Sequence, residues 1–243
     1  MGDRLIQQAL GNSEFNDFDV VTGNYNAFWL VERNLDNRTS LIVDPPDGRI
    51  PELTTAAEAL ASSRREYSRE HPSDGPEDRS LGDRCLHFEA PRLSAGYNSY
   101  FQILQTPDHV AILQEMGHIS RVIPLDGRPH VYDGVRLWTG DSRGHWDGDT
   151  LVVESNGYND RTWLHRRGLS HTENLRITER YRRLDFGHIQ LDVTYDDPGT
   201  FDSPLHANVE MELAADDEML EEVCNEASEG RSHWGGAVTD AED

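Results

Sequence analysis

The stretch GDSRGHWDGDTLVVESNGYNDRTWL, residues 140–164, sets the expected fold. Its glycines at 140, 144 and 148 surround a lone Trp146 and predict a turn, with Trp146 closing one end of a barrel. The next residues, TLVVES, have the β-branched and apolar side chains of a strand. The polar and aromatic residues that follow predict a loop that carries Asn159 and Trp163 to the barrel mouth, although Trp163 could equally anchor the core.

Around this stretch, apolar and polar residues alternate with the period of two that is typical of strands. Short turn signals such as TPD, DG and DPG separate the runs, which predicts an antiparallel meander. We expect the meander to close into a single barrel, because closure removes exposed strand edges. The fold class is therefore mainly β, and the predicted strands are YFQILQT, HVAILQEM, ISRVIPLD, VRLWTG, TLVVES, LRITERYRRLD, HIQLDVTYD, ANVEMELA and MLEEVCNE.

The residues before the meander predict an N-terminal extension with one helix. TSLIV, residues 39–43, favours a short strand that ends before two prolines. LTTAAEALASSRREYSREH, residues 53–71, favours a helix outside the barrel, capped by Thr54 or Thr55. We expect an extension over residues 1–84 that packs on the barrel, a β-barrel domain over 85–226 and a flexible acidic tail over 227–243.

The charge of the chain restricts its partners and its setting. The 243 residues carry a formal net charge of -23, from 45 acidic and 22 basic side chains. Because this field repels phosphate backbones and anionic lipid, we expect no nucleic-acid partner and no membrane partner. No segment approaches the roughly 18 apolar residues of a membrane span, and the N-terminus lacks the apolar core of a signal peptide. These features predict a cytoplasmic protein, with a homodimer left open.

The two cysteines, Cys85 and Cys224, lie far apart in the sequence. They can form a disulfide only if the fold brings them together. The sequence leaves both a disulfide and two buried thiols open.

Several polar residues fall in phase with apolar ones. In LRITERYRR, Glu179 shares a face with Ile177, and in ISRVIPLD, Arg121 shares a face with two isoleucines. In TLVVESN, Glu154 and Asn156 are in phase with a valine. A charge inside a barrel is destabilising by several kcal/mol unless it is paired, so Glu179 and Arg121 could pair across the interior, unless a bulge shifts the phase of either strand. Such a pair is either a support for the core or part of a ligand pocket, which combines apolar walls with a few polar groups.

Common cofactor and nucleophile motifs are absent from the sequence. There is no HExxH, CxxC, GxSxG, GxGxxG or phosphate-binding glycine loop. We therefore expect neither a metal nor an organic cofactor.

Four segments, TSLIVDPPDGRIP, GDSRGHWDGDTLVV, YNDRTWL and ENLRITERYRR, together resemble a large family of uncharacterised bacterial β-proteins. The family is similar to lipocalin-like barrels, which bind or transform small hydrophobic molecules. The resemblance therefore implies a single antiparallel lipocalin-like (calycin-type) β-barrel and a ligand of that kind. Many members carry secretion signals, and this chain departs from them in its acidic surface and in showing no signal peptide.

We expect an enzyme that needs no cofactor and performs general acid–base chemistry on a small hydrophobic molecule, aromatic, terpenoid or polyketide-like. The reaction would be that of a lyase, decarboxylase, dehydratase, isomerase or cyclase, because a closed interior excludes water and strengthens a few fixed charges. The alternative is a non-catalytic carrier of the same shape, which needs apolar walls but no pairing of histidine with carboxylate.

The candidate catalytic residues surround the expected barrel mouth. His171 follows a glycine-containing turn and is the expected proton-transfer group, with Glu179 or Glu154 to orient it. Tyr100 would donate a hydrogen bond to a developing oxyanion. The side chains expected to bind substrate are Arg121, Tyr97, Asn156, Asn159, Trp163 and His118. If His171 is instead satisfied within the core, the remaining histidines near strand ends are His118, His130 and His206.

Overall fold

The computed structural model describes residues 38–71, 74–75, 78–79, 81–82, 84–86, 93, 99–165, 169–219 and 221. Within these residues the chain is mainly β, as the sequence predicts, and neighbouring strands pair antiparallel. The elements are β1 (Ile42–Asp44), α3 (Thr55–Glu70), β2 (Phe101–Gln105), β3 (His109–Gln114), η3 (Met116–His118), β4 (Ile119–Pro124), β5 (Asp141–Asp147), β6 (Thr150–Asn156), β7 (Trp163–His165), β8 (Leu169–Ser170), β9 (Arg176–Arg183), β10 (His188–Asp196) and β11 (Leu205–Glu212).

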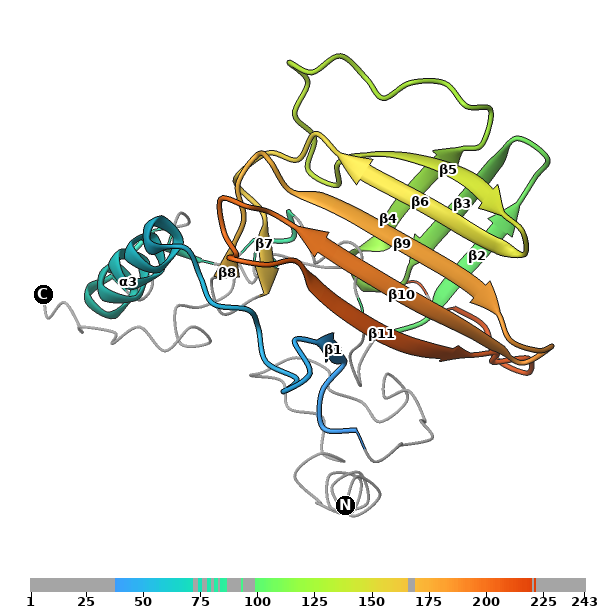
Figure 1. Cartoon of the computed structure of the whole chain (residues 1–243), viewed down its shortest axis with the longest axis horizontal. Coiled ribbons are helices and arrows are strands. Elements are labelled where there is room, and N and C mark those ends of the chain that lie inside the picture. Colours follow the sequence, from blue (N-terminus) through green and yellow to red (C-terminus); the bar gives the residue numbers. More distant parts are fainter. Residues whose placement is uncertain are drawn as a thin grey trace, which may run out of the picture.

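The larger sheet has six strands in the order β1-β11-β10-β9-β6-β5 (Figure 1). Consecutive strands joined by short turns lie side by side, which is the usual result of hairpin connections. Two neighbouring pairs are not consecutive in the chain. Strand β6 pairs with β9, although β7 and β8 lie between them in sequence, and β1 from the N-terminal region pairs with the distant β11, with Ile42 opposite Ala207. The N-terminal region therefore supplies an edge strand to the main sheet.

The expected closed barrel is not found in the part of the chain that the structure describes. Strands β2, β3 and β4 form a separate three-stranded sheet, which lies behind the larger one in Figure 1. Strands β4 and β5 are not joined by a hydrogen-bonded ladder. They meet through side chains, with Ile123 and Leu125 packed against Gly144. Two facing sheets bury their apolar faces against each other without closing into a barrel.

One core lies between the two sheets. The smaller sheet contributes Val110, Ile112 and Ile123, and the larger sheet contributes apolar side chains from β6, β9, β10 and β11. The alternation along the strands places these side chains on the inner faces. On the opposite face of the smaller sheet, Val122 is exposed.

The prediction of a turn over the first part of the opening stretch is wrong. Residues Asp141–Asp147 form strand β5, which pairs with β6 along its whole length. The turn is confined to Gly148 and Asp149, and Gly148 has the positive φ of 60° that a tight hairpin turn of this kind favours. Trp146 is 46% exposed and does not close the core. The predicted strand VRLWTG is also absent, because Leu137 makes only an isolated bridge with Tyr158.

The predicted helix is present as α3, beside β8 and apart from the main sheet in Figure 1. Thr54 caps it as expected, because its hydroxyl oxygen accepts a hydrogen bond from the backbone N–H of Ala57 at 3.2 Å. None of its residues is buried, so the helix adds nothing to the core. Among the described residues, no helix has the length and apolar character needed to cross a membrane.

Cys85 is disulfide-bonded, which excludes a free buried thiol at this position. The other cysteine of the sequence, Cys224, lies outside the described residues, as do the predicted tail over 227–243 and most of the run MLEEVCNE.

Candidate functional site

The centre of the larger sheet's inner face carries a carboxylate. Strand register puts Glu179 of β9 between Val153 of β6 and Val193 of β10, and all three side chains are buried. The valine side chains on both sides carry no polar atoms, so a partner for the carboxylate has to come from elsewhere. Glu179 is fully buried at 0% exposure, so the phase predicted for β9 is confirmed.

Arg121 of β4, on the facing sheet, supplies this partner. Its two terminal nitrogens each donate to one carboxylate oxygen of Glu179 at 2.7 Å, in the bidentate geometry that guanidinium groups favour. Tyr181 donates its hydroxyl hydrogen to the same carboxylate at 2.6 Å. Burial is the largest single effect and lowers the pKa of Arg121. The charge of Glu179, its hydrogen bonds and the nearby tyrosines together raise this pKa by more, so the guanidinium stays charged. The predicted pairing across the interior is confirmed.

A second polar group of the interior is Tyr158, which follows β6. Its side chain is buried close to Ser155, and burial raises the pKa of its phenol. Ser155 in turn shares a hydrogen bond of 2.8 Å with Ser142 of β5. The Tyr158 ring meets the ring of His171 edge to face, with 5.8 Å between the ring centres. His171 therefore lies in the interior rather than at the expected barrel mouth, which matches the alternative of a histidine satisfied within the core.

Both ring nitrogens of His171 are occupied. Nδ1 lies 2.9 Å from the backbone oxygen of Thr172, and because a carbonyl can only accept, Nδ1 carries the hydrogen. Nε2 therefore accepts a hydrogen bond from the hydroxyl group of Thr162. The ring is buried, and burial lowers its pKa despite the partly compensating carbonyl of Thr172. This arrangement holds a neutral imidazole and leaves no nitrogen for a substrate.

The segment that carries His171 is fixed by Asp197. This buried carboxylate accepts hydrogen bonds from the backbone N–H and the hydroxyl group of Thr172, both at 2.6 Å, and from the hydroxyl group of Thr200 at 2.7 Å. Burial raises the pKa of Asp197, but these donors lower it by more, and the net pKa is below its usual value. The surroundings of His171 are thus those of a structural anchor.

Glu154 does not lie where the sequence predicts. In the β6–β9 register Glu154 stands opposite Thr178, whereas Glu179 stands opposite Val153, so the two carboxylates lie on opposite faces of the sheet. Glu154 is exposed, and it cannot orient His171 from that face. Glu154 does share a face with Val152, but this is the outer face of the sheet. Val152 is buried there although its cross-strand neighbour is the charged Arg180, so a buried valine does not mark the inner face at this position.

The other predicted site residues are spread over the molecule. The Tyr100 hydroxyl group donates to Asp217 at 2.5 Å near the start of β2. Asn159 accepts a hydrogen bond from the backbone N–H of Arg161 at 3.1 Å, and His118 ends the short helix η3. Asn156 stands opposite Asp141 at the end of β6. Trp163 begins β7, and Tyr97 lies outside the described residues.

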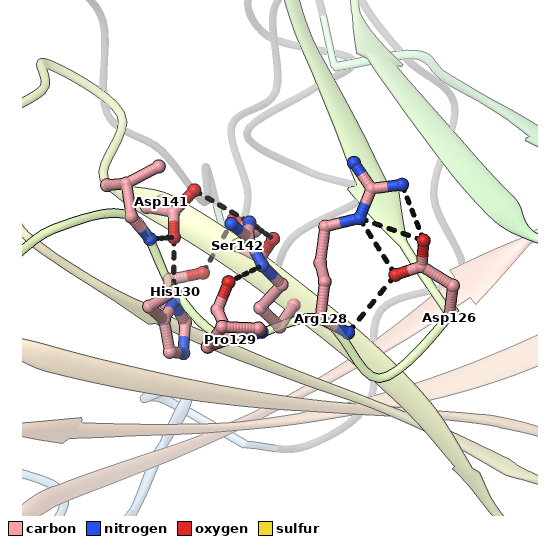
Figure 2. Close-up of polar contacts among 9 residues, drawn as sticks. Asp126, Arg128, Pro129, His130, Asp141 and Ser142 are labelled. Carbon is pink, nitrogen blue, oxygen red and sulfur yellow. Dashed lines mark hydrogen bonds and ion pairs between the residues drawn. The ribbon is translucent and has the colours of Figure 1, made fainter.

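A histidine–aspartate pair that the sequence does not reveal lies on the loop between β4 and β5 (Figure 2). Nδ1 of His130 lies 2.9 Å from Oδ2 of Asp141, the first residue of β5. The Asp141 side chain is 9% exposed and that of His130 is 29% exposed. Asp141 therefore fixes one nitrogen of a ring that solvent can reach, and among the described residues no hydrogen bond occupies Nε2.

Asp141 is held as a carboxylate. Burial raises its pKa, but hydrogen bonds from the Val131 backbone N–H at 2.9 Å, from His130 and from Arg143 at 2.7 Å lower it by more. The net pKa lies below the usual value, so Asp141 is ionised at neutral pH. An ionised Asp141 accepts the Nδ1 hydrogen of His130 and leaves the Nε2 lone pair available as a base.

The turn before this pair is also fixed. Nε of Arg128 donates to the two oxygens of Asp126 at 2.9 and 2.8 Å, and Figure 2 shows the pair beside the His130–Asp141 contact. Hydrogen bonds from Arg128 lower the pKa of Asp126 to about 2.

Exposed apolar side chains follow His130 along the same loop, which crosses the top of the molecule in Figure 1. Neighbouring exposed apolar side chains are typical of a binding surface, and these follow the histidine–aspartate pair directly in the chain. The exposed residues are Val131, Tyr132, Val135, Leu137 and Trp138.

Comparisons with protein-family models, curated proteins and solved structures give no match to this chain. In the part of the chain that the structure describes, no three histidine, cysteine, aspartate or glutamate side chains gather as metal ligands.

Proposed function

We propose that this protein is an enzyme that performs general acid–base catalysis, with His130 as the proton-transfer group and Asp141 as the residue that orients it. The observation that carries the proposal is the 2.9 Å contact between His130 Nδ1 and Asp141 Oδ2 in a ring that is partly exposed to solvent. A carboxylate that fixes the tautomer of a histidine is the arrangement that makes imidazole an effective base.

The substrate class that we propose is a small hydrophobic molecule, aromatic or otherwise flat. Exposed apolar side chains at 131–138 adjoin His130, and contact with them would exclude water from the base. The chemistry would be that of a lyase, decarboxylase, dehydratase, isomerase or cyclase, in which a proton is taken from or given to the substrate. Arg121 and Glu179 support the core in this proposal, because their polar atoms are already used by one another.

The test uses an aromatic probe, 5-nitrobenzisoxazole, whose ring opens when a base removes its carbon-bound proton. The C–H electrons form a nitrile, the ring N–O bond breaks, and a coloured phenolate leaves while the proton stays on the base. We expect the protein to accelerate this reaction over buffer. His130→Ala should lower the acceleration by about 10²-fold, the lower range for loss of a general base, and Asp141→Asn should lower it in the same direction.

A matched control is His188→Ala, at the turn between β9 and β10. Nδ1 of His188 also contacts an aspartate, Asp185, at 2.8 Å, and its ring is similarly exposed. This variant should react as the unmodified protein does. Equal rates for His130→Ala and the unmodified protein, with both folded, would exclude His130 as the base.

The second candidate function is that of a non-catalytic carrier of a hydrophobic ligand. The exposed apolar loop is also what a carrier would present to a hydrophobic ligand, but a carrier has no use for an oriented base. A probe that binds without any His130-dependent reaction would favour it.

The cellular setting that we propose follows from Cys85. Disulfides are rare in the cytosol and persist in oxidising compartments, so the bond at Cys85 favours an oxidising setting over the cytoplasmic one expected from the sequence. Denatured protein treated with a thiol-alkylating reagent should leave Cys85 unmodified unless a reductant is added first. Alkylation of Cys85 without reductant would remove the support for this setting.

A further inference from the structure

Arg143 of β5 contacts Asp141 and the backbone of the residue that precedes His130. Its Nη1 donates to Asp141 Oδ1 at 2.7 Å, and its Nε donates to the backbone oxygen of Pro129 at 3.0 Å. Pro129 is the residue directly before His130. One guanidinium group therefore links the carboxylate to the loop that carries the imidazole.

The two peptide units that flank His130 are each held from β5. Arg143 binds the carbonyl of the peptide between Pro129 and His130, and Asp141 binds the N–H of the peptide between His130 and Val131. Asp141 also binds the ring itself. The position of His130 thus depends on Asp141 and Arg143 together, although the loop around it is long and exposed.

We infer that Arg143 is a positioning residue for His130: it keeps Asp141 Oδ2 facing Nδ1 and fixes the backbone on which the imidazole turns. This inference rests on the proposed function for its catalytic consequence, but the positioning itself can be measured separately.

The chemistry of the guanidinium group explains why arginine is used here. Its planar set of donors can reach a carboxylate and a carbonyl in two directions at once, which the single ammonium group of lysine cannot do in the same geometry. The Arg143 side chain is 17% exposed, so water competes weakly for these bonds. A third bond, from Nη1 to the Ser142 backbone oxygen at 2.7 Å, fixes the guanidinium against its own strand.

The experiment compares Arg143→Met and Arg143→Lys with the unmodified protein by nitrogen NMR of the His130 ring and by the rate with 5-nitrobenzisoxazole. In the unmodified protein the ring should be in the single tautomer with hydrogen on Nδ1. Both variants should show mixed tautomers and a rate about ten-fold lower, because a small misplacement of a catalytic group has an effect of this order or larger. Arg143→Lys keeps the charge, so its failure to restore the tautomer would show that geometry matters.

The matched control is Arg180→Met, which removes another arginine–aspartate pair on the same face of the sheet, with 2.7 Å between Arg180 and Asp147. It should change neither the tautomer nor the rate. A single Nδ1–H tautomer and an unchanged rate in folded Arg143→Lys or Arg143→Met would overturn the inference. If the tautomers mix but no His130-dependent reaction exists in the unmodified protein, the positioning stands and the proposed function fails.

Discussion

Arg121 and Glu179 face each other from different sheets, and each of the two carboxylate oxygens receives one guanidinium nitrogen at 2.7 Å. The two residues are 58 positions apart in the sequence. Their side chains are 6% and 0% exposed, so the pair joins the two sheets inside the core rather than at its surface.

Removing one partner should destabilise the fold strongly. In Arg121→Met the charge of Glu179 stays buried without its partner, and the free energy of unfolding should fall by about 3–5 kcal/mol. The double variant Arg121→Met/Glu179→Leu should recover much of this loss, because no unpaired charge remains. Urea denaturation measures all three proteins. The exposed pair provides a control, since Arg180→Met should change stability by only about 0–1 kcal/mol; a similar small change for Arg121→Met would contradict the prediction.

His171 should make stability depend on pH. Because burial lowers its pKa in the folded protein, the unfolded chain binds a proton more readily, and acid favours unfolding. The contribution is fully present above the unfolded value of about 6.5 and is lost as the pH falls toward the folded pKa. His171→Gln should flatten the fall in melting temperature between pH 7 and pH 5.

His188 gives a control of opposite sign. Its hydrogen bond with Asp185 raises its pKa, so its contribution is present below the unfolded value and fades as the pH rises through the folded one. His188→Gln should therefore not flatten the acid side of the profile. An unchanged acid limb in folded His171→Gln would show that His171 titrates as it does in the unfolded chain.

Gly144 should tolerate no larger residue. A Cβ atom there would lie 2.7 Å from Leu125 Cδ2 and 2.9 Å from Ile123 Cγ2, where the smaller sheet packs on β5. Gly144→Ala should lower the free energy of unfolding by about 1–3 kcal/mol, the usual effect of overpacking. Gly187→Ala is the control, because a Cβ there meets only Asp185 Oδ1 at 3.7 Å. Thermal melts that coincide for the two variants would argue against the observed packing of β4 on β5.

The sequence by itself determined the features that depend on local chemistry and on alternation. Thr54 caps a helix because its hydroxyl group can reach the first free backbone N–H groups, whatever the rest of the fold. The period of two along β9 and β4 placed Glu179 and Arg121 inside, because successive side chains of a strand point to opposite faces. Two buried charges of opposite sign then pair, because leaving either one unpaired inside the core is strongly destabilising.

Only the tertiary structure decided which strands pair, whether the sheets close, and which distant side chains meet. The glycine-containing segment at 141–147 has weak strand preference of its own, and its backbone is extended because β6 offers a complete hydrogen-bonding partner. Alternation shows which face a residue occupies but not whether two sheets close into a barrel, and it failed for Glu154, whose valine neighbour is buried on the outer face. The contact of His130 with Asp141 arises from the path of a loop, which no periodic pattern records.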